Sequence, residues 1–133
     1  MIALHLLFLI RLLLLYEDLS SSNQILIQFN SDSIQDRFDE KIEFALFRIL
    51  QETLNNAIKH AQSTEISIVL KKVTNTLTLL KSDNGIGFDT SLINISEGIG
   101  WKNIYSRLSI INGEIVVQSE KNKGTQLTIT IPV

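Results

Sequence analysis

The chain contains no cysteine among its 133 residues. Disulfide frameworks and cysteine-based zinc sites are therefore excluded, and nothing ties the protein to an oxidising compartment, so we expect a cytoplasmic setting. The sequence also lacks a concentrated block of one charge, because its 12 basic and 14 acidic residues are mixed along the chain and give a formal net charge of −2. Since a nucleic-acid surface needs a clustered basic face, we expect no nucleic-acid partner.

An apolar run long enough to cross a membrane is missing as well. Residues 1–16 are apolar on every side, which predicts a helix that is buried all round. Arg11 interrupts this run before it reaches the roughly 20 residues that a membrane span needs. A secretory signal carries positive charge before its apolar core and small residues after it, whereas here no basic residue precedes His5 and the run ends in Tyr16-Glu17-Asp18.

The spacing of apolar residues behind this run predicts one globular domain that begins with a strand and a long helix. Residues 25–29 alternate as a short strand does. The period then changes, and a helix is expected over residues 40–61, with Asp36 or Asp39 as its N-cap. One side of this helix carries the apolar residues Phe47, Leu50, Leu54, Ala57, Ile58 and Ala61.

The rest of the chain returns mostly to strand patterns. Alternation on both sides of the Thr74-Asn75 turn predicts a hairpin. A second helix is expected from Gly100, with Gly113 as the left-handed residue that follows its C-terminus. Two last strands, over residues 114–119 and 126–131, complete an α+β fold, a two-layer sandwich in which a mixed, mostly antiparallel sheet is covered on one face by helices.

The most informative motif follows the predicted hairpin, where Asp83 opens the turn Asp83-Asn84-Gly85-Ile86-Gly87-Phe88. Gly85 and Gly87 would let the main chain come close to a ligand where a Cβ atom would collide. The plain alternative is a hairpin turn, since Asp-Asn-Gly tolerates positive φ. Ligand binding is favoured because three further motifs accompany the turn, over residues 51–61, 98–103 and 123–125.

Taken in order, these four motifs resemble the nucleotide-binding domain of sensor histidine kinases, within the ATPase superfamily that includes gyrase and the heat-shock chaperone. The resemblance covers the chain from about Ile25 to its end. It implies a Bergerat-type sandwich that uses ATP and Mg²⁺ for phosphoryl transfer to a histidine. Residues 23–133 are then the ATPase domain, and residues 1–22 resemble the end of a dimerisation helix, so that Met1 would begin a truncated gene, a split gene or a fragment.

Glu52, Asn56 and Lys59 project from one face of the long helix and can meet one ligand. The amide oxygen of Asn56 would bind a Mg²⁺ ion that is otherwise held by phosphates and water, and Lys59 would neutralise phosphate charge. The resemblance implies that Glu52 is the base that polarises the attacking group. The plain alternative is a solvated polar face.

Asp83 is the residue on which the resemblance places most weight. Its family counterpart accepts a hydrogen bond from the adenine amino group, and the ring nitrogen beside it bonds a water molecule. Such a site can discriminate adenine from guanine. Thr125, after Gly124, would help to hold this water, although a β-branched residue that begins a strand explains it nearly as well. Gly85, Gly87 and Phe88 are expected in the same ATP site.

Gly98, Ile99 and Gly100 open the second helix, where bare amides and the helix dipole form an anion site for the phosphates. The resemblance also places His60 in the ATP site, although a structural role near the helix C-terminus explains it equally. Trp101 departs from the usual aliphatic residue, and we interpret it as core or lid packing.

A phosphoacceptor histidine is missing from the pattern. In the family it is usually followed by an acidic residue, whereas His5 precedes Leu6. We therefore expect that the chain cannot autophosphorylate alone, and that its partners are a histidine-containing dimerisation domain and a downstream response regulator. Segment 89–97, where a lid over the nucleotide would lie, is short. In this it resembles the kinase subgroup whose response regulators carry helix-turn-helix domains. An unpaired N-terminal helix would favour a homodimer.

Two other functions stay open. An anti-sigma-factor serine kinase uses the same pocket as a complete small protein, which would explain a short chain but not its apolar opening helix. A nucleotide-binding interaction module without phosphotransfer is the alternative outside the enzymes. A parent kinase could be anchored in a membrane.

Overall fold

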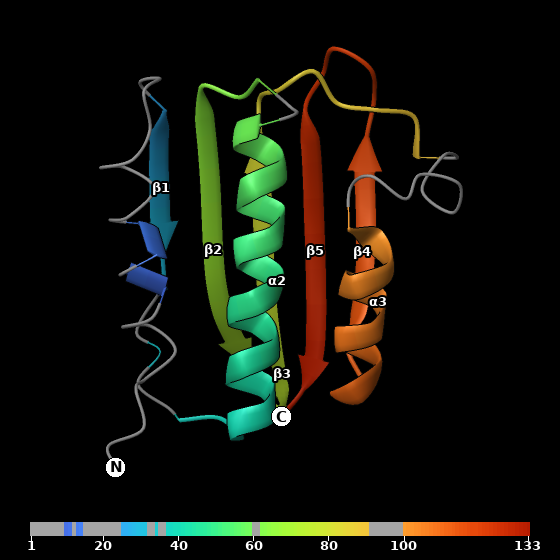
Figure 1. Cartoon of the computed structure of the whole chain (residues 1–133). Helices are drawn as coiled ribbons and strands as arrows, with labels where there is room; N and C mark the ends of the chain where they lie inside the picture. The colour runs from blue at the N-terminus through green and yellow to red at the C-terminus, as the bar shows by residue number, and fades with distance from the viewer. Residues whose placement is uncertain are drawn as a thin grey trace.

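The computed structural model describes residues 10–11, 13–14, 25–31, 34, 37–59, 62–90 and 100–133. Within these residues a single five-stranded sheet has the order β1-β2-β3-β5-β4, and two long helices lie on one of its faces (Figure 1). The elements are β1 (Leu26–Asn30), α2 (Glu40–Lys59), β2 (Glu65–Val73), β3 (Thr76–Asp83), α3 (Trp101–Ile110), β4 (Glu114–Ser119) and β5 (Thr125–Pro132).

The sheet is mixed but mostly antiparallel. Only β1 and β2 run parallel, whereas the pairs β2–β3, β3–β5 and β4–β5 are antiparallel. β2 and β3 form the expected hairpin around Thr74-Asn75. The predicted α+β two-layer sandwich is confirmed, because α2 and α3 cover the same face of this sheet (Figure 1).

α2 begins where the sequence indicates. The Asp39 carboxylate accepts a hydrogen bond of 2.8 Å from the backbone N–H of Lys41, so Asp39 is the N-cap that was predicted as one of two candidates. Asp36, the other candidate, lies outside the described residues. Ile49, Leu50 and Leu54 are fully buried against the sheet, as expected for the apolar side of an amphipathic helix.

The end of α3 corrects one prediction. The left-handed residue is Asn112, with φ of 56°, and not Gly113. The N–H of Gly113 bonds the carbonyl of Leu108 at 2.9 Å, and the N–H of Asn112 bonds that of Ser109. This is a Schellman motif in which Asn takes the left-handed position. Gly113 is needed instead for packing, since a Cβ there would lie 2.8 Å from a methyl group of Leu108.

The core lies between the two helices and the sheet and includes residues near the N-terminus. Ile10 and Leu13 are helical and buried in the same apolar cluster as the inward residues of the strands. Most of the segment 1–22, predicted as the end of a dimerisation helix, lies outside the described residues, so that the division into residues 1–22 and 23–133 stays a prediction. Among the described helices, none is long and apolar enough to cross a membrane.

Several element ends lie at one end of the molecule, at the top of Figure 1. α2, β3 and β4 end there and β2 and β5 begin there, whereas α3 begins lower down, beside the middle of α2. The antiparallel register fixes part of this arrangement, because Asp83 at the end of β3 pairs with Thr125 at the start of β5. Residues from three of the predicted motifs are thereby brought together.

Candidate nucleotide-binding site

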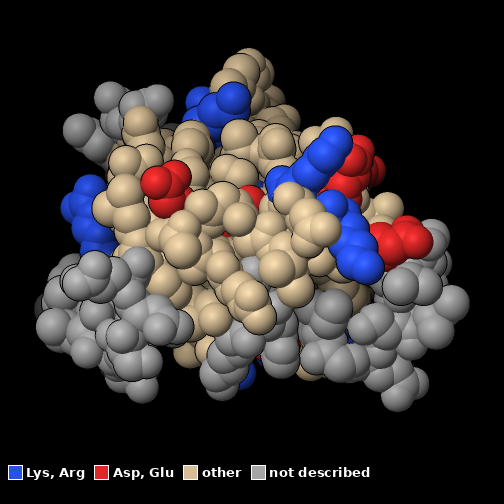
Figure 2. Space-filling view, turned by 90° about the horizontal axis from the view of Figure 1, so that it is seen from above, with Lys and Arg blue, Asp and Glu red and all other residues tan. Residues whose placement is uncertain are grey.

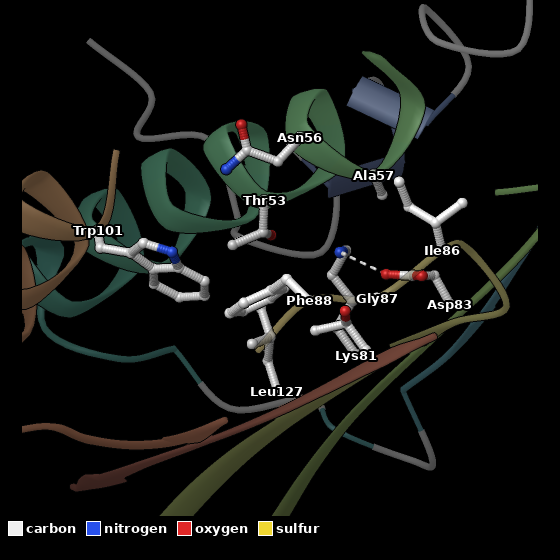
Figure 3. A pocket seen from close by; sticks show the side chains of 11 residues that line it. Thr53, Asn56, Ala57, Lys81, Asp83, Ile86, Gly87, Phe88, Trp101 and Leu127 are labelled. Carbon is white, nitrogen blue, oxygen red and sulfur yellow. Dashed lines mark ion pairs between the residues drawn. The ribbon is translucent and has the colours of Figure 1, made fainter. Parts of the chain in front are cut away.

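A cavity of about 230 Å³ opens between α2, the sheet and the loop that follows β3. It is mostly apolar, with a few polar groups, as ligand sites usually are. Figure 3 shows the side chains that line it. They are Thr53, Asn56, Ala57, Lys81, Asp83, Ile86, Gly87, Phe88, Trp101, Thr125 and Leu127.

Asp83 supplies the carboxylate of the cavity. One oxygen, Oδ1, accepts a hydrogen bond of 2.9 Å from the backbone N–H of Gly85, which fixes the side chain over the turn. Its side chain is only 3% exposed. A carboxylate is rarely buried to this degree unless both of its oxygens have partners. Because Oδ1 is bonded to Gly85, Oδ2 is the oxygen that can accept from a donor inside the cavity.

Lys81 is the cation beside this carboxylate. Leu77, Leu79 and Lys81 occupy the inward positions of β3, and Lys81 is 4% exposed. Its ammonium lies 4.0 Å from Oδ2 of Asp83, as the dashed line in Figure 3 marks. Burial lowers the pKa of Lys81 from 10.5 to about 8, while the charge of Asp83 acts in the opposite direction.

Thr125 is held at the base of the cavity by a hydroxyl network. Ser119 accepts the N–H of Phe88 at 2.9 Å and donates to the carbonyl of Gly124 at 3.0 Å. Its oxygen also lies 2.8 Å from the hydroxyl oxygen of Thr125. Because Ser119 has one hydrogen and a carbonyl can only accept, Thr125 is the donor in their bond. The oxygen of Thr125 therefore keeps acceptor capacity toward the cavity.

The two glycines Gly87 and Gly124 let two loops pack on each other. Gly87 has φ of 64°, and a Cβ on it would collide with the backbone carbonyl of Glu120. A Cβ on Gly124, with φ of 83°, would collide with the carbonyl of Asp83. At Gly87 the missing side chain therefore makes room for the neighbouring loop, whereas the sequence suggested room for a ligand.

Glu52 and Gly100 meet at the N-terminus of α3. Gly100 caps this helix in the left-handed conformation, with φ of 77°, and makes no side-chain cap hydrogen bond. A Cβ on Gly100 would collide with a carboxylate oxygen of Glu52. The first amides of α3 and the Glu52 carboxylate therefore face the same small region at the cavity mouth, where the helix dipole favours negative charge.

Asn56 is the side chain that could hold a metal ion. It is half-buried and lies on α2 at the cavity wall, one helical turn beyond Glu52. Among the described residues no group of three or more His, Cys, Asp or Glu side chains gathers as a metal cage would. One amide oxygen nevertheless fits Mg²⁺, which usually takes few protein ligands and completes its shell with phosphates and water.

Trp101 forms the side wall of the cavity together with Phe88. Their ring centroids are 5.8 Å apart and the planes are tilted by 46°. The indole Nε1 is buried and has no hydrogen-bond partner among the described residues, and in Figure 3 it points toward Thr53 and the middle of the cavity. Trp101 packs in the core, as expected. It also lines the cavity, which the expectation of core or lid packing did not include.

The structure brings together most of the predicted site residues that it describes. Asn56, Asp83, Gly87, Phe88 and Thr125 line the cavity. Gly85 bonds Asp83 at its edge, and Glu52 and Gly100 meet at its mouth. The predicted residues His60, Gly98 and Ile99, and the side chain of Lys59, lie outside the described part.

Sequence reasoning missed Thr53, Lys81 and Ser119. The strand alternation held a signal for Lys81, because this residue has the parity of the inward residues Leu77 and Leu79. Ser119 and Thr53 gave no such signal.

Charge around the opening is spread out. Figure 2 shows this end of the molecule, where Lys and Arg side chains are spaced around the surface and Asp and Glu side chains lie among them. One such pair joins Lys123 and Glu120 at 3.1 Å in the loop beside the cavity. Both side chains are largely exposed, so this pair adds little to stability.

Comparisons with known proteins assign the chain. The family model described as "Histidine kinase-, DNA gyrase B-, and HSP90-like ATPase" matches residues 41–133. The signal transduction histidine-protein kinase/phosphatase DegS of Brevibacillus brevis is 33% identical over 110 residues, which are 82% of this chain and 28% of that protein. The oxygen sensor histidine kinase NreB of Staphylococcus carnosus is 30% identical over 107 residues, 80% of this chain and 31% of that protein.

Solved structures agree on the fold. The Acinetobacter baumannii histidine kinase AdeS superimposes with a TM-score of 0.79 at 18% identity, over 96% of this chain and 64% of that one. The chain spans less than a third of the length of the two curated relatives. The family model, in contrast, matches well over half of this chain and includes the Asp83 turn, the α3 N-terminus and Thr125. The chain belongs to the family of histidine kinase-, DNA gyrase B- and HSP90-like ATPases.

Proposed function

We propose that the chain is the ATP-binding catalytic domain of a sensor histidine kinase, which transfers the γ-phosphoryl group of Mg-ATP to a histidine on a separate dimerisation domain. The observation that carries the proposal is the cavity with Asp83 and Thr125 at its base and the bare N-terminus of α3 at its mouth. Such a site offers polar contacts to a base at one end and amides to phosphates at the other. Both curated relatives are histidine kinases by name, which supports the kinase assignment.

The base end of the site is suited to adenine. Oδ2 of Asp83 would accept a hydrogen bond from the exocyclic amino group, and Thr125 would contact the same edge of the ring through an ordered water molecule. Guanine presents a carbonyl oxygen where adenine presents the amino group. Because two acceptors would then face each other in a buried site, guanine is disfavoured. Phe88 and Trp101 would pack beside the base.

The phosphate end would use the turn that precedes α3. Gly98, Ile99 and Gly100 would present backbone amides to the phosphates, and Lys59 and His60 would approach them from the end of α2. These contacts follow from the motif order and from the position of Gly100 at the α3 N-terminus.

Asn56 would bind the Mg²⁺ ion, which would supply charge neutralisation to the phosphates when it is bound. Glu52 would act as the base that polarises the attacking histidine. Its carboxylate lies against Gly100, where the terminal phosphate would be held, and this short separation supports the role.

The dimerisation domain and a response regulator would be the macromolecular partners. A regulator with a helix-turn-helix domain is favoured by the short segment 89–97. A homodimer through the N-terminal apolar helix remains part of the same proposal.

Nucleotide binding is the first test. The full chain, Asp83→Asn and Glu114→Gln are titrated calorimetrically with a non-hydrolysable ATP analogue and Mg²⁺. Glu114 is exposed at the opposite end of the sheet, so its variant is a matched control that should bind as the parent does. Asp83→Asn should weaken binding at least about tenfold, because the amide can offer its N–H where the amino group needs an acceptor. A folded parent chain that does not bind the analogue contradicts the proposal.

Phosphoryl transfer is the second test. The chain is incubated with γ-labelled ATP alone, and then with an added histidine-containing dimerisation domain. Label should appear on the added domain and not on this chain, and Glu52→Gln should abolish the transfer while it leaves nucleotide binding nearly unchanged. ATP binding without any transfer would favour a nucleotide-binding interaction module.

A further inference from the structure

Lys81 is a charged side chain in an unusual place. It occupies an inward position of β3 in line with Leu77 and Leu79, both of which are core residues. An apolar residue would satisfy this position at no electrostatic cost, whereas lysine is almost never fully buried without a partner. The side chain rises from the sheet toward α2 between Asp83 and Phe88, inside the cavity (Figure 3).

The partner that the described residues provide for Lys81 is incomplete. Its only polar contact among the described residues is Oδ2 of Asp83 at 4.0 Å, which is too long for a hydrogen bond. An ammonium group carries three donors. The cavity lining also includes the polar side chains Thr53, Asn56 and Thr125, but among the described residues Lys81 makes no hydrogen bond to any of them. Burial lowers the pKa of Lys81 to about 8, which is consistent with this shortage of partners.

Asp83 and Lys81 together present a donor beside an acceptor. Oδ1 of Asp83 is engaged by the N–H of Gly85, so Oδ2 is the oxygen that faces both Lys81 and the cavity. The two groups attract each other but are held too far apart to bond. A ligand edge that places its own acceptor next to its own donor would satisfy both of them at once.

We propose that Lys81 is a base-recognition residue. Its ammonium donates a hydrogen bond directly to the ring nitrogen N1 of adenine, and the neighbouring amino group of the base donates one to Asp83. The inference rests on the proposed function, in which ATP occupies this cavity. Adenine presents the acceptor N1 and the donor N6 as neighbours on one edge, which matches the order of Lys81 and Asp83. In this site a protein side chain takes the contact that the family resemblance assigned to a water molecule.

The competing interpretation is that Lys81 only neutralises Asp83. In that case the ammonium would compete with the adenine amino group for Oδ2, and its removal would strengthen nucleotide binding. The two interpretations differ in whether the effect of Lys81 depends on N1 of the base, which is a property that a structural role alone would not produce.

The test is a thermodynamic cycle between Lys81 and N1. Affinities of Mg-ADP and of 1-deaza-ADP, in which a C–H group replaces N1, are measured by calorimetry for the full chain, Lys81→Met and Lys71→Met. Lys71 is exposed on β2, so its variant is the matched control. A hydrogen bond from a charged donor predicts that 1-deaza-ADP binds the parent and Lys71→Met about tenfold or more weakly than ADP does. In Lys81→Met the two ligands should bind within about threefold of each other.

Each outcome has a distinct meaning. The inference would be overturned, while ATP binding stands, if replacing N1 by C–H weakened binding equally in the parent and in Lys81→Met. It would be overturned as well if Lys81→Met bound ADP more tightly than the parent and kept the same preference for ADP over 1-deaza-ADP. A folded parent chain that binds neither ligand would overturn the proposed function, and the inference with it. If Lys81→Met does not fold by circular dichroism, Lys81→Gln replaces it, and the neutral donor should retain only part of the N1 dependence.

Discussion

The carboxylate of Glu52 lies against Gly100, so that the middle of α2 and the start of α3 touch at a position where a Cβ atom would collide with this carboxylate. Gly100 also needs its left-handed φ of 77° to turn the chain into α3. One glycine therefore sets both the direction of the helix and the position of the expected catalytic carboxylate. This contact joins two of the four motifs, although they are far apart in the sequence.

Gly100→Ala should displace the Glu52 side chain and lower phosphoryl transfer strongly, while it lowers the free energy of unfolding only modestly. The added methyl group collides with the far end of a flexible side chain, which can move, while the left-handed φ costs about 1 to 2 kcal/mol of unfolding free energy. We expect urea unfolding to show this modest loss. Phosphoryl transfer to an added dimerisation domain should fall much further, about tenfold or more, because the base is misplaced.

The double variant Glu52→Ala/Gly100→Ala is the control for this prediction. Without the carboxylate the collision disappears, so the effects of the two substitutions on transfer activity should be non-additive. The free energy of unfolding should still be lowered, because alanine at position 100 keeps the unfavourable left-handed φ. Strict additivity in both measurements would mean that the contact between Glu52 and Gly100 has no functional weight.

Ser119→Ala should loosen the base of the cavity. Its hydroxyl bonds Phe88, Gly124 and Thr125, and its removal leaves these half-buried groups without their shared partner. We expect the free energy of unfolding to fall by about 1 to 3 kcal/mol and ADP affinity to fall with it. Ser109→Ala, at an exposed position of α3, is the control and should change neither the free energy of unfolding nor the ADP affinity. If Ser119→Ala and Ser109→Ala behave alike in chemical denaturation and calorimetry, Ser119 does not support the base of the cavity.

The fold could be predicted from the sequence because it depends on periodicity. The 3.6-residue spacing of Leu50, Leu54 and Ala57 and the alternation on both sides of Thr74-Asn75 each select one local structure. The start of α2 was predictable for a similar reason, since Asp39 is a strong N-cap residue. The end of α3 was not, because Asn112 and Gly113 can both adopt the left-handed conformation and packing against Leu108 decides between them.

The site was predictable only where a residue type carries its own chemistry. Asp83 stood out because it opens a Gly-x-Gly turn after a strand. Asn56 stood out because it shares one face of a predicted helix with Glu52 and Lys59. Lys81 and Ser119 depend on tertiary contacts instead. The parity of β3 places Lys81 inward, but only the sheet register and the fold of the loop show that it reaches Asp83 and that Ser119 joins three separate groups.

Tryptophan fluorescence should report nucleotide binding. Trp101 is the single tryptophan of the chain, and it lines the cavity beside Phe88 with its indole N–H buried and unbonded among the described residues. A nucleotide in the cavity would change the surroundings of the ring, so ADP should shift or quench its emission in a saturable manner. Asp83→Asn should need a much higher ADP concentration for the same change. An emission spectrum that ADP leaves unaltered, while calorimetry detects binding, would place the nucleotide elsewhere.

Lys81 should make stability depend on pH in the alkaline range. Its pKa is lowered from 10.5 in the unfolded chain to about 8 in the folded one, so between these values the unfolded state binds a proton that the native state does not. Stability should therefore rise as the pH increases from about 8 to about 10.5, by up to about 3 kcal/mol for the full shift. Below pH 8 both states carry the proton, and this contribution is constant.

Urea unfolding at a series of pH values measures this contribution in the parent, Lys81→Met and Lys71→Met. Asp83 is the charged group that faces Lys81, and the side chains around them in the cavity are uncharged, so the rise should be removed by Lys81→Met alone. Lys71→Met should keep the slope of the parent because Lys71 is exposed. If all three proteins show the same slope between pH 8 and 10.5, folding does not lower the pKa of Lys81, and the expected contribution is contradicted.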